Sequence, residues 1–156
     1  MRIHLLAAGT RLPSWINTGF NEYAERLPPE CRLQLKEIPL SNKRRGGNVT
    51  KAIADEGARM LAAIPGRACV IALEVRGRSF NTQELAKQFD RWLKDGRDLA
   101  LMIGGPDGLA AECVKGAELT WSLSSLTLPH GLVRVVVAEQ LYRAWTLLKG
   151  HPYHRA

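Results

Sequence analysis

The last residues of the chain bring together several side chains that can transfer protons and bind phosphate. His151, Tyr153, His154 and Arg155 supply two imidazoles, a phenol and a guanidinium within five residues. Chemistry on an RNA base uses aromatic rings for stacking, histidine for proton transfer and arginine for phosphate. Because chain ends are often frayed, a disordered end is the simpler alternative for this segment.

Two arginines in the preceding segment, Arg134 and Arg143, are further candidates for binding a phosphate or a cofactor carboxylate. Glu139 stands four residues before Arg143 in a stretch predicted to be helical. An ion pair at this spacing explains Glu139 and Arg143 without any further role.

A glycine-rich segment, Gly104-Gly105-Pro106-Asp107-Gly108, follows an apolar run. Glycine lets a ligand approach the backbone closely, and free amides before a helix favour a group rich in acceptors. The spacing matches neither the dinucleotide-binding fingerprint nor a Walker loop, which disfavours a small nucleotide-binding domain. A tight strand-to-helix turn is the alternative that needs no ligand.

The segment from Ser122 to Gly131 mixes hydroxyl groups with three leucines, and it lies between a predicted strand and a predicted helix. An adenine ring requires apolar packing together with exposed backbone donors and acceptors, and this composition can provide both. A loop partly buried against the core is the equally compatible alternative.

These candidate segments are positioned by an alternation of strands and helices along the whole chain. Strands are predicted at residues 2–8, 32–38, 68–73, 99–103 and 119–123. Helices are predicted at residues 14–27, from about 48 to 64, and at 81–96, 109–117 and 132–149, with a polar loop at 41–48. The pattern predicts one α/β domain over residues 1–156, in which helices sandwich a largely parallel sheet.

The predicted helix starts depend on capping residues. Ser14 is expected to cap the first helix, Asn48 or Thr50 the second, and Asn81 with Glu84 has the spacing of a capping box. In open α/β sheets, ligands bind beyond the carboxyl ends of the strands. The loops that follow residues 73, 103 and 123 are therefore the expected ligand-binding positions.

The composition favours an anionic partner and disfavours several other classes. The chain has 156 residues, 46% of them hydrophobic, and a net charge of +7. No apolar run approaches the roughly 20 residues of a membrane span, and the first residues lack the features of a signal peptide. The cysteines at 31, 69 and 113 form no CxxC pair, so we expect neither a disulfide framework nor a metal site. A reduced, cytoplasmic protein is the expectation.

The last predicted helix is apolar around most of its circumference. Val133, Val137 and Leu141 form one stripe, and residues such as Leu132 and Val135 extend it. A helix with this pattern is buried, and a chain of this size has few helices with which to bury it. A homodimer interface is the favoured explanation, and burial within the monomer is the alternative.

Taken in order, four motifs resemble one known family over essentially the whole chain. They are residues 103–108 (IGGPDG), 123–130 (LSSLTLPH), 139–144 (EQLYRA) and 151–155 (HPYHR). The set closely resembles the RlmH family of SPOUT-class methyltransferases. The resemblance implies S-adenosylmethionine-dependent methylation of N3 of a pseudouridine in 23S rRNA, on the assembled ribosome. It also implies a homodimer and a C-terminal trefoil knot that forms the cofactor pocket.

The resemblance further implies roles for individual residues. The positions that match the family's cofactor-binding segments are Leu73, Gly104, Gly105, Leu123, Ser124, Ser125, Leu126, Thr127 and Leu128. Gly131 departs from the family, in which other residues such as proline follow the histidine.

The catalytic candidates are His130, Arg143, Tyr153, His154 and Arg155. In a dimer, the tail of one subunit could complete the site of the other. A non-catalytic module that binds RNA or the ribosome is the alternative function for the same scaffold.

Overall fold

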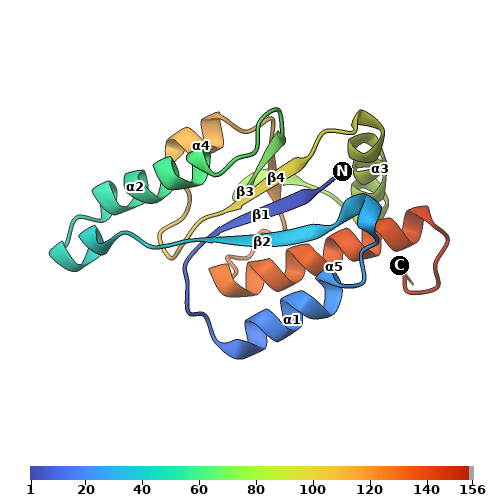
Figure 1. Cartoon of the computed structure of the whole chain (residues 1–156), viewed down its shortest axis with the longest axis horizontal. Coiled ribbons are helices and arrows are strands. Elements are labelled where there is room, and N and C mark those ends of the chain that lie inside the picture. The colour runs from blue at the N-terminus through green and yellow to red at the C-terminus, as the bar shows by residue number, and fades with distance from the viewer. Residues whose placement is uncertain (155–156) are drawn as a thin grey trace.

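Five strands pair into one parallel sheet in the computed structural model, which describes residues 1–154 (Figure 1). The strands are β1 (Ile3–Ala8), β2 (Leu33–Ile38), β3 (Cys69–Ser79), β4 (Leu99–Ile103) and β5 (Leu119–Ser122). Their order in the sheet is β2-β1-β4-β3-β5. All of the pairings between these strands are parallel, which confirms the predicted α/β fold.

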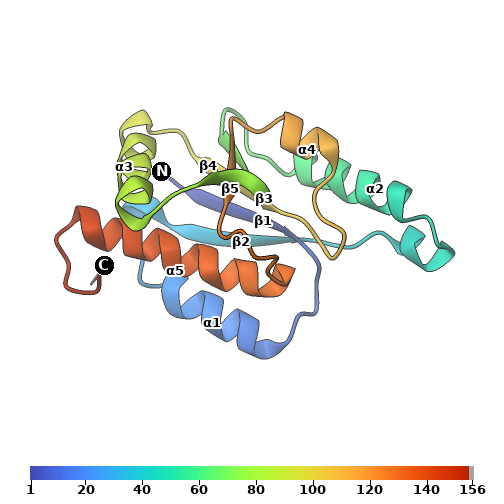
Figure 2. The same ribbon diagram turned by 180° about the vertical axis from the view of Figure 1, so that it is seen from behind.

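Helices cover both faces of this sheet (Figures 1 and 2). The α-helices are α1 (Ser14–Ala24), α2 (Val49–Ala62), α3 (Thr82–Asp95), α4 (Ala111–Lys115) and α5 (His130–Leu148). Two short 3₁₀ helices, η1 (Pro29–Cys31) and η2 (Asn42–Gly46), lie in the connections. Helices α2 and α4 lie on one face, whereas α1 and α5 lie on the other.

Successive side chains of the central strands point to opposite faces of the sheet and pack into two separate hydrophobic cores. In β1, Leu5 packs with residues of α1, α3 and α5, whereas Leu6 packs with residues of α2 and α4. Both side chains are almost completely buried. This arrangement explains the continuous apolar runs of the sequence, because both faces of these strands are covered.

Two of the predicted helix caps are present and one is wrong. The Asn81 side chain accepts a hydrogen bond from the Glu84 amide, and the Glu84 carboxylate accepts one from the Asn81 amide, both at 2.9 Å. The Asn48 side chain caps α2. Ser14 caps nothing: it is the first helical residue, and Pro13 precedes it without a side-chain hydrogen bond.

Two segments are more ordered than predicted. Strand β3 was expected to end at residue 73 but continues to Ser79, with a register shift between Leu73 and Arg78 where it pairs with β5. Gly77 permits this pairing, because a Cβ there would lie 2.7 Å from the Thr120 carbonyl oxygen. The predicted polar loop at 41–48 contains the 3₁₀ helix η2.

Much of the apolar circumference of α5 is covered within the monomer. Val137 and Leu141 are completely buried in the core that α5 shares with α1, α3 and the sheet. Val135 lies against Gly19 of α1, where a Cβ would be 3.3 Å from its methyl groups. The intramolecular alternative therefore accounts for a large part of the pattern, and the dimer interface stays a prediction.

Candidate active site

A cavity of about 610 Å³ lies at the carboxyl ends of the strands. Its lining comes from the second half of β3, the loop after β4, and the segment from β5 into α5. These are the three positions at which a ligand was expected. The predicted cofactor-binding residues in the lining are Leu73, Gly104, Gly105, Leu123, Ser124, Leu126, Thr127 and Leu128. Ser125 is not part of the lining.

The glycine-rich loop after β4 is a tight turn as well as a wall of the cavity. A Cβ on Gly104 would lie 2.4 Å from the Gly108 carbonyl carbon and 2.5 Å from the Leu109 nitrogen. Gly108 has a φ of +87°, and its amide donates to the Gly105 carbonyl over 3.0 Å. Any side chain at position 104 would clash with the backbone of the same loop, so this turn requires a glycine there.

The serine- and leucine-rich segment after β5 uses its hydroxyl groups to hold its own shape. The Ser122 hydroxyl donates to the Ser124 carbonyl oxygen, and the Leu126 amide donates to the Ser124 hydroxyl, both over 3.0 Å. Leu126 remains 71% exposed although it lines the cavity. A ligand in the cavity could therefore pack against the exposed Leu126 side chain.

His130 is the histidine of the cavity lining, and it occupies the first turn of α5. Burial, and then the charges of Arg134 and Arg44, lower its pKa below the ordinary value of 6.5. The imidazole is therefore neutral near pH 7 and can accept a proton. The next residue, Gly131, lets α5 approach α1 closely, because a Cβ would lie 2.4 Å from Ile16 Cδ1.

Arg134 is buried inside the protein, where it cannot bind a phosphate or a cofactor carboxylate as predicted. Its side chain is fully buried and donates to Glu37 over 2.7 Å and to the Gly9 carbonyl oxygen over 2.9 Å. These bonds tie α5 to the ends of β1 and β2. The interpretation of Arg134 as a residue that binds an external phosphate or carboxylate is therefore wrong.

The tail after α5 folds back onto the last turns of that helix. The Tyr153 hydroxyl donates to Glu139 over 2.9 Å, and the Arg143 guanidinium also bonds Glu139 while lying 5.1 Å from the Tyr153 ring centre. The Tyr142 and Tyr153 rings pack edge to face at 4.8 Å. Hence the tail is ordered as far as His154, and Arg155 lies outside the described residues.

This cluster holds its groups in defined protonation states. Burial, and then the hydrogen bond to Glu139, raise the pKa of Tyr153 above its ordinary value of 10. The phenol therefore stays protonated near pH 7 and donates a hydrogen bond to Glu139. The hydrogen bond from Arg143 to Glu139 raises the pKa of Arg143 as well, and it is the helical ion pair that the spacing predicted.

The structure does not bring the predicted catalytic residues together within one chain. His130 begins α5, whereas Tyr153 and His154 follow its end (Figure 2). The Tyr153 hydroxyl bonds Glu139, which lies nine positions after His130 in α5. At a rise of about 1.5 Å per residue, this hydroxyl lies roughly 14 Å from His130 along the helix axis.

The sequence of the chain matches a known family along its whole length. Residues 1–154 match the model of a family described as "Predicted SPOUT methyltransferase". The chain belongs to the SPOUT methyltransferase family. A Thioalkalivibrio sulfidiphilus protein named Ribosomal RNA large subunit methyltransferase H is 56% identical and aligned over 99% of both chains. A Methylococcus capsulatus protein of the same name is 54% identical over 99% of this chain and 100% of the relative.

The fold of this chain also resembles solved structures whose sequence identity to it is low. A "probable methylase family protein" from Haemophilus influenzae superimposes with a TM-score of 0.55 at 16% identity, over 99% of this chain and 70% of that one. A Legionella pneumophila protein solved in complex with SAM gives a TM-score of 0.50 at 12% identity, over 92% of this chain and 66% of that one. These similarities support the architecture alone.

The cavity of this SPOUT chain contains one charged residue, Glu74, that was not among the predicted site residues. Glu74 directly follows Leu73 in β3 and is the carboxylate of the lining among the described residues. The signal that could have found it is the end of the apolar run at residue 73, after which the side chains reach the carboxyl edge of the sheet.

Within residues 1–154, no cluster of three or more His, Cys, Asp or Glu side chains is placed to hold a metal ion. No helix in the described part of the chain is both long and apolar enough to cross a membrane.

Proposed function

We propose that this SPOUT-family protein uses S-adenosylmethionine (SAM) to methylate N3 of a pseudouridine in the 23S rRNA of the assembled ribosome. The observation that carries this proposal is the 56% identity, over the whole chain, to a relative named Ribosomal RNA large subunit methyltransferase H. A ribosomal substrate also agrees with the net charge of +7. Because ribosomes are the substrate in this proposal, we propose a cytoplasmic location as well.

The cavity suits SAM in its size and in its chemistry. Its volume of about 610 Å³ lies within the range of roughly 300–1,000 Å³ that is usual for small-molecule sites. Leu123, Leu126 and Leu128 can pack against a flat ring, and the Glu74 carboxylate complements a positively charged ligand. When bound, SAM supplies a methyl group that its sulfonium centre already activates.

His130 is positioned to handle the proton of the reaction. N3 of pseudouridine is an imide N–H, so it must lose its proton as the new N–C bond forms and the S–C bond breaks. The bonding electrons of the broken bond stay on sulfur, which leaves S-adenosylhomocysteine. A neutral imidazole in the cavity lining can accept the N3 proton.

The distance between the cavity and the tail supports a homodimer in which two copies share each site. The tail of one chain packs against the middle of its own α5, where the Tyr153 hydroxyl bonds Glu139, and neither Tyr153 nor His154 lines the cavity of that chain. In such a dimer, Tyr153, His154 and Arg155 of one copy contact the target nucleotide in the cavity of the other. Half-buried apolar residues of α5 such as Leu132 and Val136 are available for the interface.

The family also leads us to propose that the segment around the cavity is threaded as a trefoil knot. Three loops from distant parts of the sequence meet there, which is the place where such threading would shape a cofactor pocket.

The decisive experiment is transfer of a radiolabelled methyl group from SAM to ribosomes that lack the modification. We expect label in 23S rRNA of intact ribosomes and far less in free large subunits. Labelling of neither substrate by folded protein would overturn the proposal.

Calorimetry with SAM separates this function from its alternative, a non-catalytic RNA- or ribosome-binding module. An enzyme of this kind takes up SAM in the absence of RNA, whereas a pure binding module shows no uptake.

A further inference from the structure

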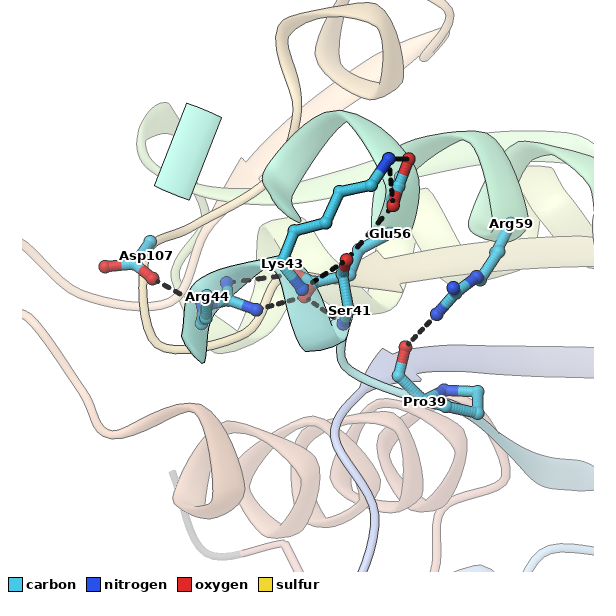
Figure 3. Close-up of polar contacts among 8 residues, drawn as sticks. Pro39, Ser41, Lys43, Arg44, Glu56, Arg59 and Asp107 are labelled. Carbon is cyan, nitrogen blue, oxygen red and sulfur yellow. Dashed lines mark hydrogen bonds and ion pairs between the residues drawn. The ribbon is translucent and has the colours of Figure 1, made fainter. Parts of the chain in front are cut away.

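The glycine-rich loop beside the cavity has few side chains with which to hold its shape. Between Gly104 and Gly108 it contains three glycines and a proline, and it closes on a single backbone bond from Gly108 to Gly105. Among the hydrogen bonds of residues 1–154, one side-chain bond reaches this loop. It runs from Arg44 Nε to Asp107 Oδ2 over 2.9 Å and joins residues 63 positions apart (Figure 3).

Arg44 is itself fixed by a buried carboxylate. Glu56 of α2 is only 4% exposed and accepts hydrogen bonds from both terminal nitrogens of Arg44, the Nη2 bond being 3.0 Å long. It also accepts one from the Ser41 amide at 2.7 Å. A carboxylate that is removed from water needs such partners, so the pair holds the guanidinium in one place.

The loop also packs directly against this buried pair. A Cβ on Gly105 would lie 3.1 Å from Leu40 Cδ2 and 3.8 Å from Glu56 Oε1. Asp107 is not part of the cavity lining and points toward Arg44 (Figure 3), whereas its neighbours Pro106 and Gly108 line the cavity. The tether therefore acts on the outer side of the loop and leaves the inner side free.

We propose that Arg44 is a positioning residue for the cavity, which it serves by holding Asp107 and thereby the glycine-rich loop in the ligand-binding conformation. This inference rests on the proposed function only in taking SAM as the ligand. A glycine-rich loop loses much conformational freedom when it is ordered. A tether that orders it beforehand removes part of that cost from binding.

The test compares Asp107→Ala and Arg44→Met with Lys43→Met as the matched control. Lys43 belongs to the same 3₁₀ helix, but its partner is Asp55, 3.0 Å away, which forms no bond to the loop. SAM affinity is measured by calorimetry, and amide hydrogen exchange of residues 104–109 is measured in the ligand-free protein.

We expect Asp107→Ala and Arg44→Met each to weaken SAM binding by about 5- to 10-fold and to speed exchange in the loop. The variant that carries both changes should bind SAM no more weakly than the single variant with the lower SAM affinity, because both changes remove the same contact. Lys43→Met should leave both measurements unchanged.

Asp107→Ala decides the question even if Arg44→Met proves unstable, because Asp107 is exposed whereas Arg44 neutralises a buried charge. Wild-type affinity in a folded Asp107→Ala variant, or a loss no larger than that of Lys43→Met, would overturn the inference.

The two proposals fail in different ways. If the wild-type protein takes up no SAM, the proposed function fails, and the exchange rates of the ligand-free variants still decide whether Arg44 holds the loop. If the wild type binds SAM and the variants match it in affinity and exchange, only the tether is wrong.

Discussion

The two halves of α5 carry opposite kinds of surface. At its start, the cavity is built from backbone, glycines and leucines, with His130 and Glu74 as its titratable groups among the described residues. Beside its second half, Glu139 and Arg143 form a compact network of charge and hydrogen bonds with Tyr153 of the tail. The start of the helix borders a cavity that can enclose a ligand, whereas the network holds a guanidinium and a protonated phenol against one carboxylate.

This difference indicates that neither region is a complete site for methylating RNA. Within residues 1–154, the cavity has a carboxylate and no Lys or Arg in its lining, so it has no cation with which to bind the phosphates of RNA. Among the same described residues, the network on the surface has no cavity in which a cofactor could be positioned. Neither Tyr153 nor His154 lines the cavity of its own chain, and we propose that a second chain brings the two sets of groups together.

Deletion of residues 151–156 tests the division of labour and has the largest expected effect. We expect methyl transfer to fall by about 1,000-fold or more, since the deletion removes several groups that act on the nucleotide. SAM affinity should stay within about 2-fold of wild type, because none of the residues from 151 to 154 lines the cavity. Calorimetry and radiolabelled transfer measure the two quantities separately, and full activity of the truncated protein would refute the division.

Mixing variants shows whether the tail acts across the dimer. A tail-deleted chain mixed with a Gly104→Ala chain should regain activity, because a mixed dimer contains one intact cavity facing one intact tail. If the mixture is no more active than its components, the tail does not act in trans.

The pH dependence of the reaction tests the chemistry at the cavity end. Because the pKa of His130 lies below 6.5, its neutral form persists to lower pH than for an ordinary histidine. Activity should therefore fall only on the acid side of pH 6.5. His130→Gln should slow turnover by about 100-fold and abolish that acid limb. An unchanged acid limb in the variant would assign the base to another group.

Gly104→Ala tests the shape of the cavity. The new Cβ would meet the Gly108 and Leu109 backbone at 2.4–2.5 Å, so the loop must move. We expect SAM affinity to fall by about 30-fold, which corresponds to roughly 2 kcal/mol. Gly66→Ala is the matched control, because no atom lies within 4 Å of a Cβ there. Equal SAM affinities for the two variants would contradict the expected effect.

Replacing glutamate by glutamine, once in the cavity and once in the network, has the smallest expected effect on SAM affinity. Glu74→Gln should weaken SAM binding by about 5-fold, since it removes the carboxylate of the cavity lining. Glu139→Gln should leave SAM affinity unchanged and reduce turnover, because it loosens Arg143 and Tyr153. Comparable effects of both changes on SAM affinity would contradict the separation of roles.

Local patterns predicted most of the fold and the location of the cavity. The apolar runs at residues 68–73 and 99–103 indicate strands that are buried on both faces, and Asn81 with Glu84 marks a helix start. The structure confirms these features. Ser14 was misassigned because a capping residue type alone does not show which of two neighbouring residues begins the helix.

The succession of strands and helices along the chain, the loops that surround the cavity and the family could all be predicted from the sequence. These depend on periodicity, turn residues and motifs that lie within a few positions of one another. The packing of the folded chain was needed to show that Arg134 is buried, that Arg44 bonds Asp107 and that Tyr153 folds back onto Glu139. Each of these depends on how remote segments pack, and the spacing of residues along a chain does not specify the distance between side chains that only the fold brings together or keeps apart.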